Sequence, residues 1–94
     1  MEHYGEIGIG AYIDLMKSYL QERITVDQYR QSYFDLSKKR LAPHDEAVSE
    51  IVMKGYGDAD DYDVVVKLPY TIDEGELRKR VTASLDAFAL LGYK

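Results

Sequence analysis

The chain has 94 residues, a hydrophobic content of 46% and a formal net charge of −5, from 17 acidic and 12 basic side chains. This length fits one domain, residues 1–94, with a core for three or four helices but not for a deep substrate cavity. The absence of cysteine excludes disulfides and thiol catalysis, and the acidic balance disfavours direct nucleic-acid binding and favours a basic partner.

A pair of helices is predicted in the first half of the chain. The first ten residues are rich in glycine and are expected to form a loose lead-in. Apolar side chains then recur at every third or fourth position over residues 9–22 and again over 26–40, which predicts two amphipathic helices. Thr25 and Gln28 form the sequence pattern of a capping box at the start of the second helix. The short gap between the helices predicts an antiparallel hairpin.

Two further helices are predicted in the second half. Helical spacing of apolar residues covers residues 44–54 and 73–91, and Gly92 follows the last helix as a stop signal. Gly55 and Gly57 are expected to end the third helix. The sequence therefore predicts an all-α fold, an antiparallel four-helix bundle around one core.

The segment 55–72 between the last two helices is expected to be an irregular acidic connection. Val64–Val66 has high β-propensity, but no second strand is evident for it to pair with. We therefore expect it to be extended chain packed over the bundle. Thr71 with Glu74, or Asp73 with Glu76, supplies a capping signal for the helix that follows.

Carboxylates are concentrated in this connection. Residues 58–63 contain four aspartates, and residues 58–76 contain seven acids and one base, whereas residues 23–40 carry five bases and two acids. A concentrated negative surface can occupy a basic cleft in place of phosphates, and carboxylates accept paired hydrogen bonds from arginine. The alternative is a solvated loop with helix-capping acids.

The third helix and its flanks supply further candidates for contact with a partner. Glu46, Glu50 and Met53 share one face, and Tyr56 and Tyr62 flank the acidic segment as possible anchors, because tyrosine is enriched at binding hot spots. The alternative is that this face of the helix is exposed to solvent and contacts no partner. Four further tyrosines lie on apolar helix stripes and are expected in the core: Tyr12, Tyr19, Tyr29 and Tyr33.

No catalytic, cofactor-binding or metal-binding constellation is predicted. The aspartates from Asp58 onward begin like an EF-hand loop, but Asp63 stands where the loop requires glycine and Pro69 where it requires glutamate. The histidines, His3 and His44, are too few for a metal site. We expect a protein that is not an enzyme and binds no cofactor.

Several short motifs resemble, in their order, those of the colicin D immunity family. The matching segments are Ile13-Asp14-Leu15, Tyr19-Leu20, Ile24-Thr25-Val26 with Tyr29, Tyr56-Gly57-Asp58-Ala59-Asp60, and Tyr70 to Arg78. Together they extend from about residue 11 to residue 91. The resemblance implies a helical bundle that binds the nuclease domain of a tRNA-cleaving toxin and covers its basic active-site cleft. Related proteins protect cells that deliver toxins by contact-dependent growth inhibition.

These features together predict an immunity protein that neutralises a cognate bacterial nuclease toxin, with a helical adaptor as the alternative. We expect a cytoplasmic monomer that binds its toxin 1:1 and contacts neither nucleic acid nor membrane, since no apolar run approaches the roughly 20 residues of a membrane span. The residues expected to contact the toxin are Glu46, Glu50, Tyr56, Asp58, Asp60, Asp61, Tyr62, Asp63, Asp73 and Glu74.

Overall fold

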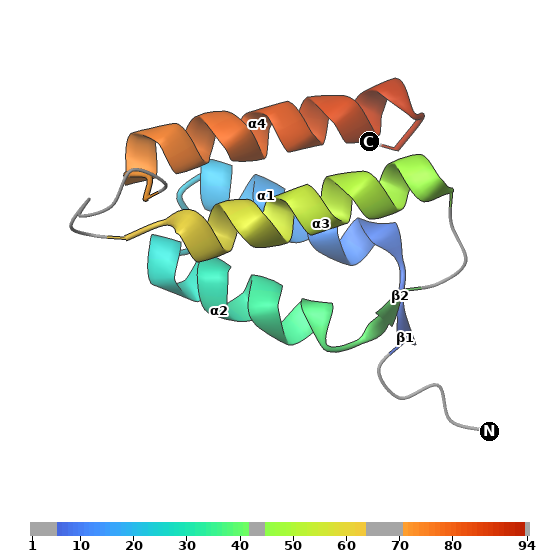
Figure 1. Ribbon diagram of the computed structural model, residues 1–94, viewed down its shortest axis with the longest axis horizontal. Helices are drawn as coiled ribbons and strands as arrows, with labels where there is room; N and C mark the ends of the chain where they lie inside the picture. The colour runs from blue at the N-terminus through green and yellow to red at the C-terminus, as the bar shows by residue number, and fades with distance from the viewer. Residues whose placement is uncertain (1–5, 42–44, 64–70, 94) are drawn as a thin grey trace.

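The computed structural model describes residues 6–41, 45–63 and 71–93 of the chain. Within these ranges it is an all-α four-helix bundle, as the sequence predicts (Figure 1). The elements are β1 (Glu6–Ile7), α1 (Ile9–Leu20), α2 (Val26–Ser37), β2 (Arg40–Leu41), α3 (Glu46–Asp61) and α4 (Glu74–Leu90).

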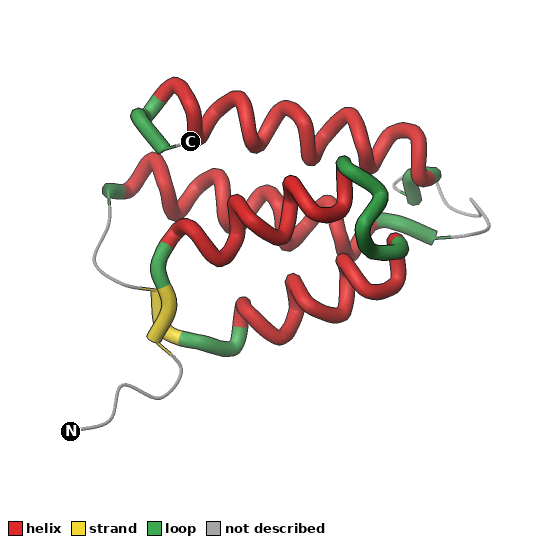
Figure 2. The backbone as a smooth tube through the Cα atoms, turned by 180° about the vertical axis from the view of Figure 1, so that it is seen from behind, coloured by secondary structure: helices red, strands yellow, loops and turns green. Residues whose placement is uncertain are grey.

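Successive helices run in opposite directions, so the predicted hairpin of α1 and α2 is confirmed (Figures 1 and 2). α1 packs against α2 and α4, and α3 packs against the same two helices. α1 and α3 therefore lie at opposite corners of the bundle. The end of α3 and the start of α4 consequently come to the same end of the molecule.

Local signals set the turn between α1 and α2. The Thr25 hydroxyl accepts a hydrogen bond from the Gln28 amide at 3.1 Å, and the Gln28 side chain accepts one from the Thr25 amide at 2.8 Å. This is the predicted capping box. α1 ends two residues earlier than expected, at Leu20, because Glu22 takes a positive φ of 62° and turns the chain.

Tyrosine rings form the centre of the core. The four tyrosines that were expected inside are at most 2% exposed. Tyr19 stacks on Tyr29 with ring centroids 4.7 Å apart, and Tyr33 packs against both Tyr29 and Tyr12, at 5.8 and 5.1 Å. α4 completes the core with buried side chains of Leu77, Val81 and Phe88.

The expectation that Gly55 and Gly57 end the third helix is wrong. α3 continues through both glycines to Asp61, so residues 55–61 are helical and not an irregular connection. Gly55 instead makes room for α2: a Cβ there would overlap the Tyr33 hydroxyl, which donates a 2.8 Å hydrogen bond to the Val52 carbonyl. Glycine is required at this position by a close helix–helix approach.

The lead-in and the end of the second helix also differ from expectation. α2 ends at Ser37 and not at residue 40, and Arg40–Leu41 pairs in parallel with Glu6–Ile7 of the lead-in. Such a pairing between distant segments has no local sequence signal. α3 begins at Glu46 and not at residue 44, because Asp45 before it is extended and is the cap residue of the helix. The Val64–Val66 segment lies outside the described residues.

Candidate partner-binding surface

Asp58, the first acid of the acidic segment 58–63, is buried. It is 6% exposed and lies in the part of α3 that faces α4. Lys54, one turn earlier, reaches one carboxylate oxygen at 3.0 Å, and Arg80 of α4 reaches the other at 3.2 Å. A carboxylate this deeply buried requires such partners, because an unpaired buried charge is strongly destabilising.

Arg80 connects three carboxylates from two helices. Besides Asp58, its guanidinium lies 3.1 Å from Glu76 and 3.7 Å from Asp61. The hydrogen bond that Arg80 donates to Glu76, and after it the one that Arg80 donates to Asp58, raise the pKa of Arg80 above its usual value. The planar guanidinium can serve several carboxylates at once, so it fixes the last turn of α3 against the first turns of α4.

Two other arginines donate hydrogen bonds to backbone carbonyls at the C-terminal ends of helices. Arg30 of α2 donates to the Ala59 carbonyl at 2.8 Å, in the last turn of α3, and covers the ring of Tyr62 at 5.4 Å. Arg78 of α4 approaches the carbonyls of Tyr19 and Leu20 at 3.5 and 3.4 Å, at the end of α1. Positive charge at these positions opposes the negative ends of the two helix dipoles.

The beginning of α4 is fixed by backbone and side-chain bonds. A parallel bridge joins Tyr62 to Ile72, and the Asp73 carboxylate accepts a hydrogen bond from the Glu76 amide at 2.8 Å. Asp73 is therefore the helix cap, the second of the two capping signals in the sequence. Glu74 accepts a 3.0 Å hydrogen bond from the Tyr19 hydroxyl, and burial followed by this contact raises the pKa of Tyr19 above its ordinary value.

An acidic face remains exposed along the outside of α3. Glu46, Glu50 and Asp60 are exposed and share this face with Met53, which is 73% exposed. Tyr56 is 44% exposed beside them, and its ring packs edge-on against Phe34 of α2 at 5.3 Å. We call this set the α3 face. It combines carboxylates with one flexible and one aromatic apolar side chain, a mixture suited to binding a protein surface.

The structure divides the predicted contact residues into two groups. Asp58 and Tyr62 are buried, so they support the surface from within and are not accessible on it. The other eight predicted residues are exposed or half-buried: Glu46, Glu50, Tyr56, Asp60, Asp61, Asp63, Asp73 and Glu74. The last four lie around the junction of α3 and α4, beside the α3 face.

Sequence reasoning missed the basic residues that organise these acids. The Lys54–Asp58 spacing of four residues is a recognisable helix pair, but only once residues 55–61 are known to be helical. The contacts of Arg80 with Asp58 and of Arg30 with Ala59 cross between helices, and no local pattern predicts them.

In residues 6–41, 45–63 and 71–93, no three histidine or carboxylate side chains converge as a group that could hold a metal ion. No helix within these ranges is both long and apolar enough to cross a membrane.

An all-α bundle that displays an ordered acidic face has the properties of a small protein-binding module. The family model described as bacterial self-protective colicin-like immunity matches residues 7–88, most of the chain. The chain therefore belongs to this family and is a bacteriocin immunity protein, whose partner is a toxin. This family is not catalytic, which agrees with a protein that is not an enzyme. No match was found among curated proteins or among solved structures.

Proposed function

We propose that this immunity protein neutralises a nuclease toxin, of the tRNA-cleaving colicin D class, by placing the α3 face and the α3–α4 junction on the toxin's basic active-site cleft. A nuclease must hold phosphates with lysines and arginines, so its cleft attracts an acidic surface. Electrostatic attraction of this kind accelerates encounter and selects the partner. The complex is proposed to form in the cytoplasm between one immunity protein and one toxin domain.

The position of the acids on α3 is the observation that carries this proposal. Asp58, Asp60 and Asp61 occupy the last turn of the helix, where the dipole disfavours negative charge. Lys54, Arg30 and Arg80 offset part of this cost from within the fold. Acids gathered where they are locally unfavourable, and then paired with bases of the same and neighbouring helices, are expected where the exposed charge has a function.

We expect the exposed side chains of this surface to contribute most of the free energy of binding to the toxin. Asp60 and Glu50 point away from the core, whereas Asp61 lies 3.7 Å from Arg80 and has a second role in the fold. Tyr56 and Met53 lie between Glu50 and Asp60 on α3 and provide apolar contact area at the centre of the surface.

Charge reversal of the α3 face tests the proposal. The cognate toxin domain is co-expressed with the wild type or with the Glu50→Lys, Asp60→Lys double variant, and survival and co-purification are scored. We expect the double variant to fold normally and to bind the toxin domain at least 100-fold more weakly, since close charge pairs across interfaces contribute about 1.5–7 kcal/mol.

Asp14→Lys is the control for overall charge, with half the charge change of the double variant, because Asp14 is exposed on α1, at the corner opposite α3. It changes the net charge without changing the α3 face and should leave protection intact. A loss of binding free energy in the control about half that of the double variant, in proportion to the charge change, would assign the effect to overall charge. Full protection by the double variant, with a normal helical circular dichroism spectrum, would disprove the assigned surface.

A further inference from the structure

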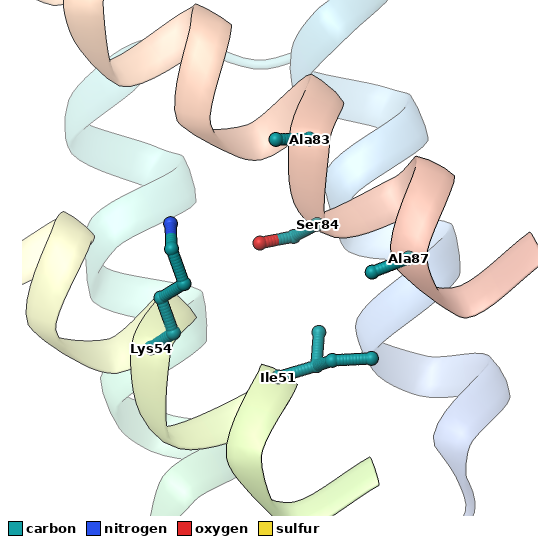
Figure 3. Close-up of a pocket in the computed structure, with 5 residues that line it drawn as sticks. All are labelled: Ile51, Lys54, Ala83, Ser84 and Ala87. Atoms are coloured by element: carbon teal, nitrogen blue, oxygen red, sulfur yellow. The ribbon is translucent and has the colours of Figure 1, made fainter. Parts of the chain in front are cut away.

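A small hollow lies between α3 and α4, beside the α3 face. Ile51 and Lys54 line it from α3, and Ala83, Ser84 and Ala87 line it from α4 (Figure 3). Its volume is about 140 Å³ and its walls are almost entirely apolar. The hollow exists because α4 presents two alanines and a serine where larger side chains would close the space between the helices.

The Ser84 hydroxyl points into this hollow without a hydrogen-bond partner. Ser84 is 3% exposed, and its Oγ is buried and unpaired in the described part of the chain. Figure 3 shows the oxygen directed into the space between the two helices, toward Lys54. A buried hydroxyl that lacks a partner costs free energy, so an incoming molecule that pairs with Ser84 would recover that cost.

Bound water does not match the hollow well. An ordered buried water normally makes two to four hydrogen bonds. The walls offer the Ser84 hydroxyl, while the Lys54 ammonium is already 3.0 Å from the Asp58 carboxylate. An occupant with an apolar body and a single polar tip matches the lining better than water does.

We infer that the hollow receives one tyrosine side chain of the toxin, an inference that rests on the proposed function. The ring would pack against Ile51 and the two alanines, and the phenol would exchange a hydrogen bond with Ser84. An aliphatic side chain would leave the hydroxyl unpaired, and a basic one would be repelled by Lys54. The Lys54 ammonium is instead attracted to an aromatic ring.

The position of the hollow also supports this occupant. Lys54, which lines the hollow, lies one turn after Glu50, so the hollow adjoins the α3 face on the surface of the helix. A buried aromatic anchor surrounded by charged contacts is the usual arrangement of a binding hot spot. The carboxylates would attract the basic toxin, and the hollow would fix its position.

Small-molecule binding tests the chemistry of the hollow without the toxin. Amide NMR shifts are followed while p-cresol, which reproduces the tyrosine side chain, or toluene, which lacks the hydroxyl, is added to the full chain. We expect saturable shifts around Ser84 and Lys54, with p-cresol binding about tenfold more tightly than toluene, as one hydrogen bond provides. Ser84→Ala should remove that difference. Equal binding of the two compounds, or shifts elsewhere only, would overturn the inference.

Two hollow variants test the same site in the toxin complex. Ser84→Ala removes the unpaired hydroxyl, so it should leave stability equal or higher while weakening toxin binding about tenfold. A purely structural role would not produce that combination. Ala83→Leu should block the hollow and weaken binding further, whereas Ala89→Leu, exposed on another side of α4, should not.

The outcomes separate this inference from the proposed function. If binding depends on Glu50 and Asp60 but is unchanged in both hollow variants, the tyrosine site is disproved and the acidic surface remains. If the wild type fails to bind the toxin domain, the proposed function is disproved, and the p-cresol comparison still decides whether the hollow accepts a phenol.

Discussion

Single residues of α3 show how the same amino acid takes opposite roles within one helix. Gly55 lies beneath the Tyr33 ring, where an added Cβ would meet side-chain atoms, whereas Gly57 has no atom within 4 Å of that position. Both glycines carry the same entropic cost in a helix interior. Only at Gly55 does a packing gain offset it.

This difference gives a prediction for two alanine substitutions. Gly55→Ala should displace Tyr33, weaken its hydrogen bond to Val52 and lower the free energy of unfolding by roughly 1–3 kcal/mol. Gly57→Ala should raise it by about 0.5–1 kcal/mol, because alanine is the better helix former. Urea unfolding measures both values, and the same sign for the two variants would contradict this assignment.

Two helices of the bundle, α1 and α4, end with the same turn geometry. At the end of α1 the amides of Glu22 and Arg23 bond to the carbonyls of Tyr19 and Ser18, at 3.0 and 2.9 Å. The end of α4 repeats this pattern of two bonds, with Gly92 in the position of Glu22. Both are Schellman motifs, and both place one residue at positive φ, 62° and 99°.

The two motifs differ in the residue that adopts the left-handed conformation. Glu22→Gly should stabilise the protein by about 0.5–1 kcal/mol, because glycine avoids the Cβ clash at positive φ. Gly92→Ala should destabilise it by about 1 kcal/mol for the same reason. Thermal unfolding followed by circular dichroism checks both. A destabilised Glu22→Gly variant would mean that the glutamate side chain has a role of its own.

The whole molecule depends on a core built from tyrosines. Burial raises the pKa of Tyr29 and of Tyr33 above the ordinary value of 10, as it does for Tyr19. The unfolded chain therefore loses these protons near pH 10, while the folded chain keeps them to higher pH. Stability is fully present below pH 10 and falls as the pH rises above it.

The free energy of unfolding is therefore expected to fall steeply as the pH rises above 10. The three tyrosines with the largest pKa shifts together reduce the free energy of unfolding by about 4 kcal/mol per pH unit above pH 10, at roughly 1.4 kcal/mol each. Burial also raises the pKa of Tyr12 and of Tyr62, which makes the fall just above pH 10 steeper. Circular dichroism and tyrosinate absorbance should change together. Tyr29→Phe should reduce the slope by about 1.4 kcal/mol per pH unit, the contribution of one tyrosine. An unchanged slope in Tyr29→Phe would contradict the prediction.

The sequence by itself determined the helical class, the number and order of the helices, the Thr25 cap and the tyrosine core, because periodicity and capping act over a few residues. Only the tertiary structure decided that α3 continues through Gly55, since the reason is a ring on another helix. It also decided that Asp58 and Tyr62 are buried while Asp60 is exposed. Arg80 and Arg30 hold that end of α3 from neighbouring helices, and such contacts between distant residues leave no local trace in the sequence.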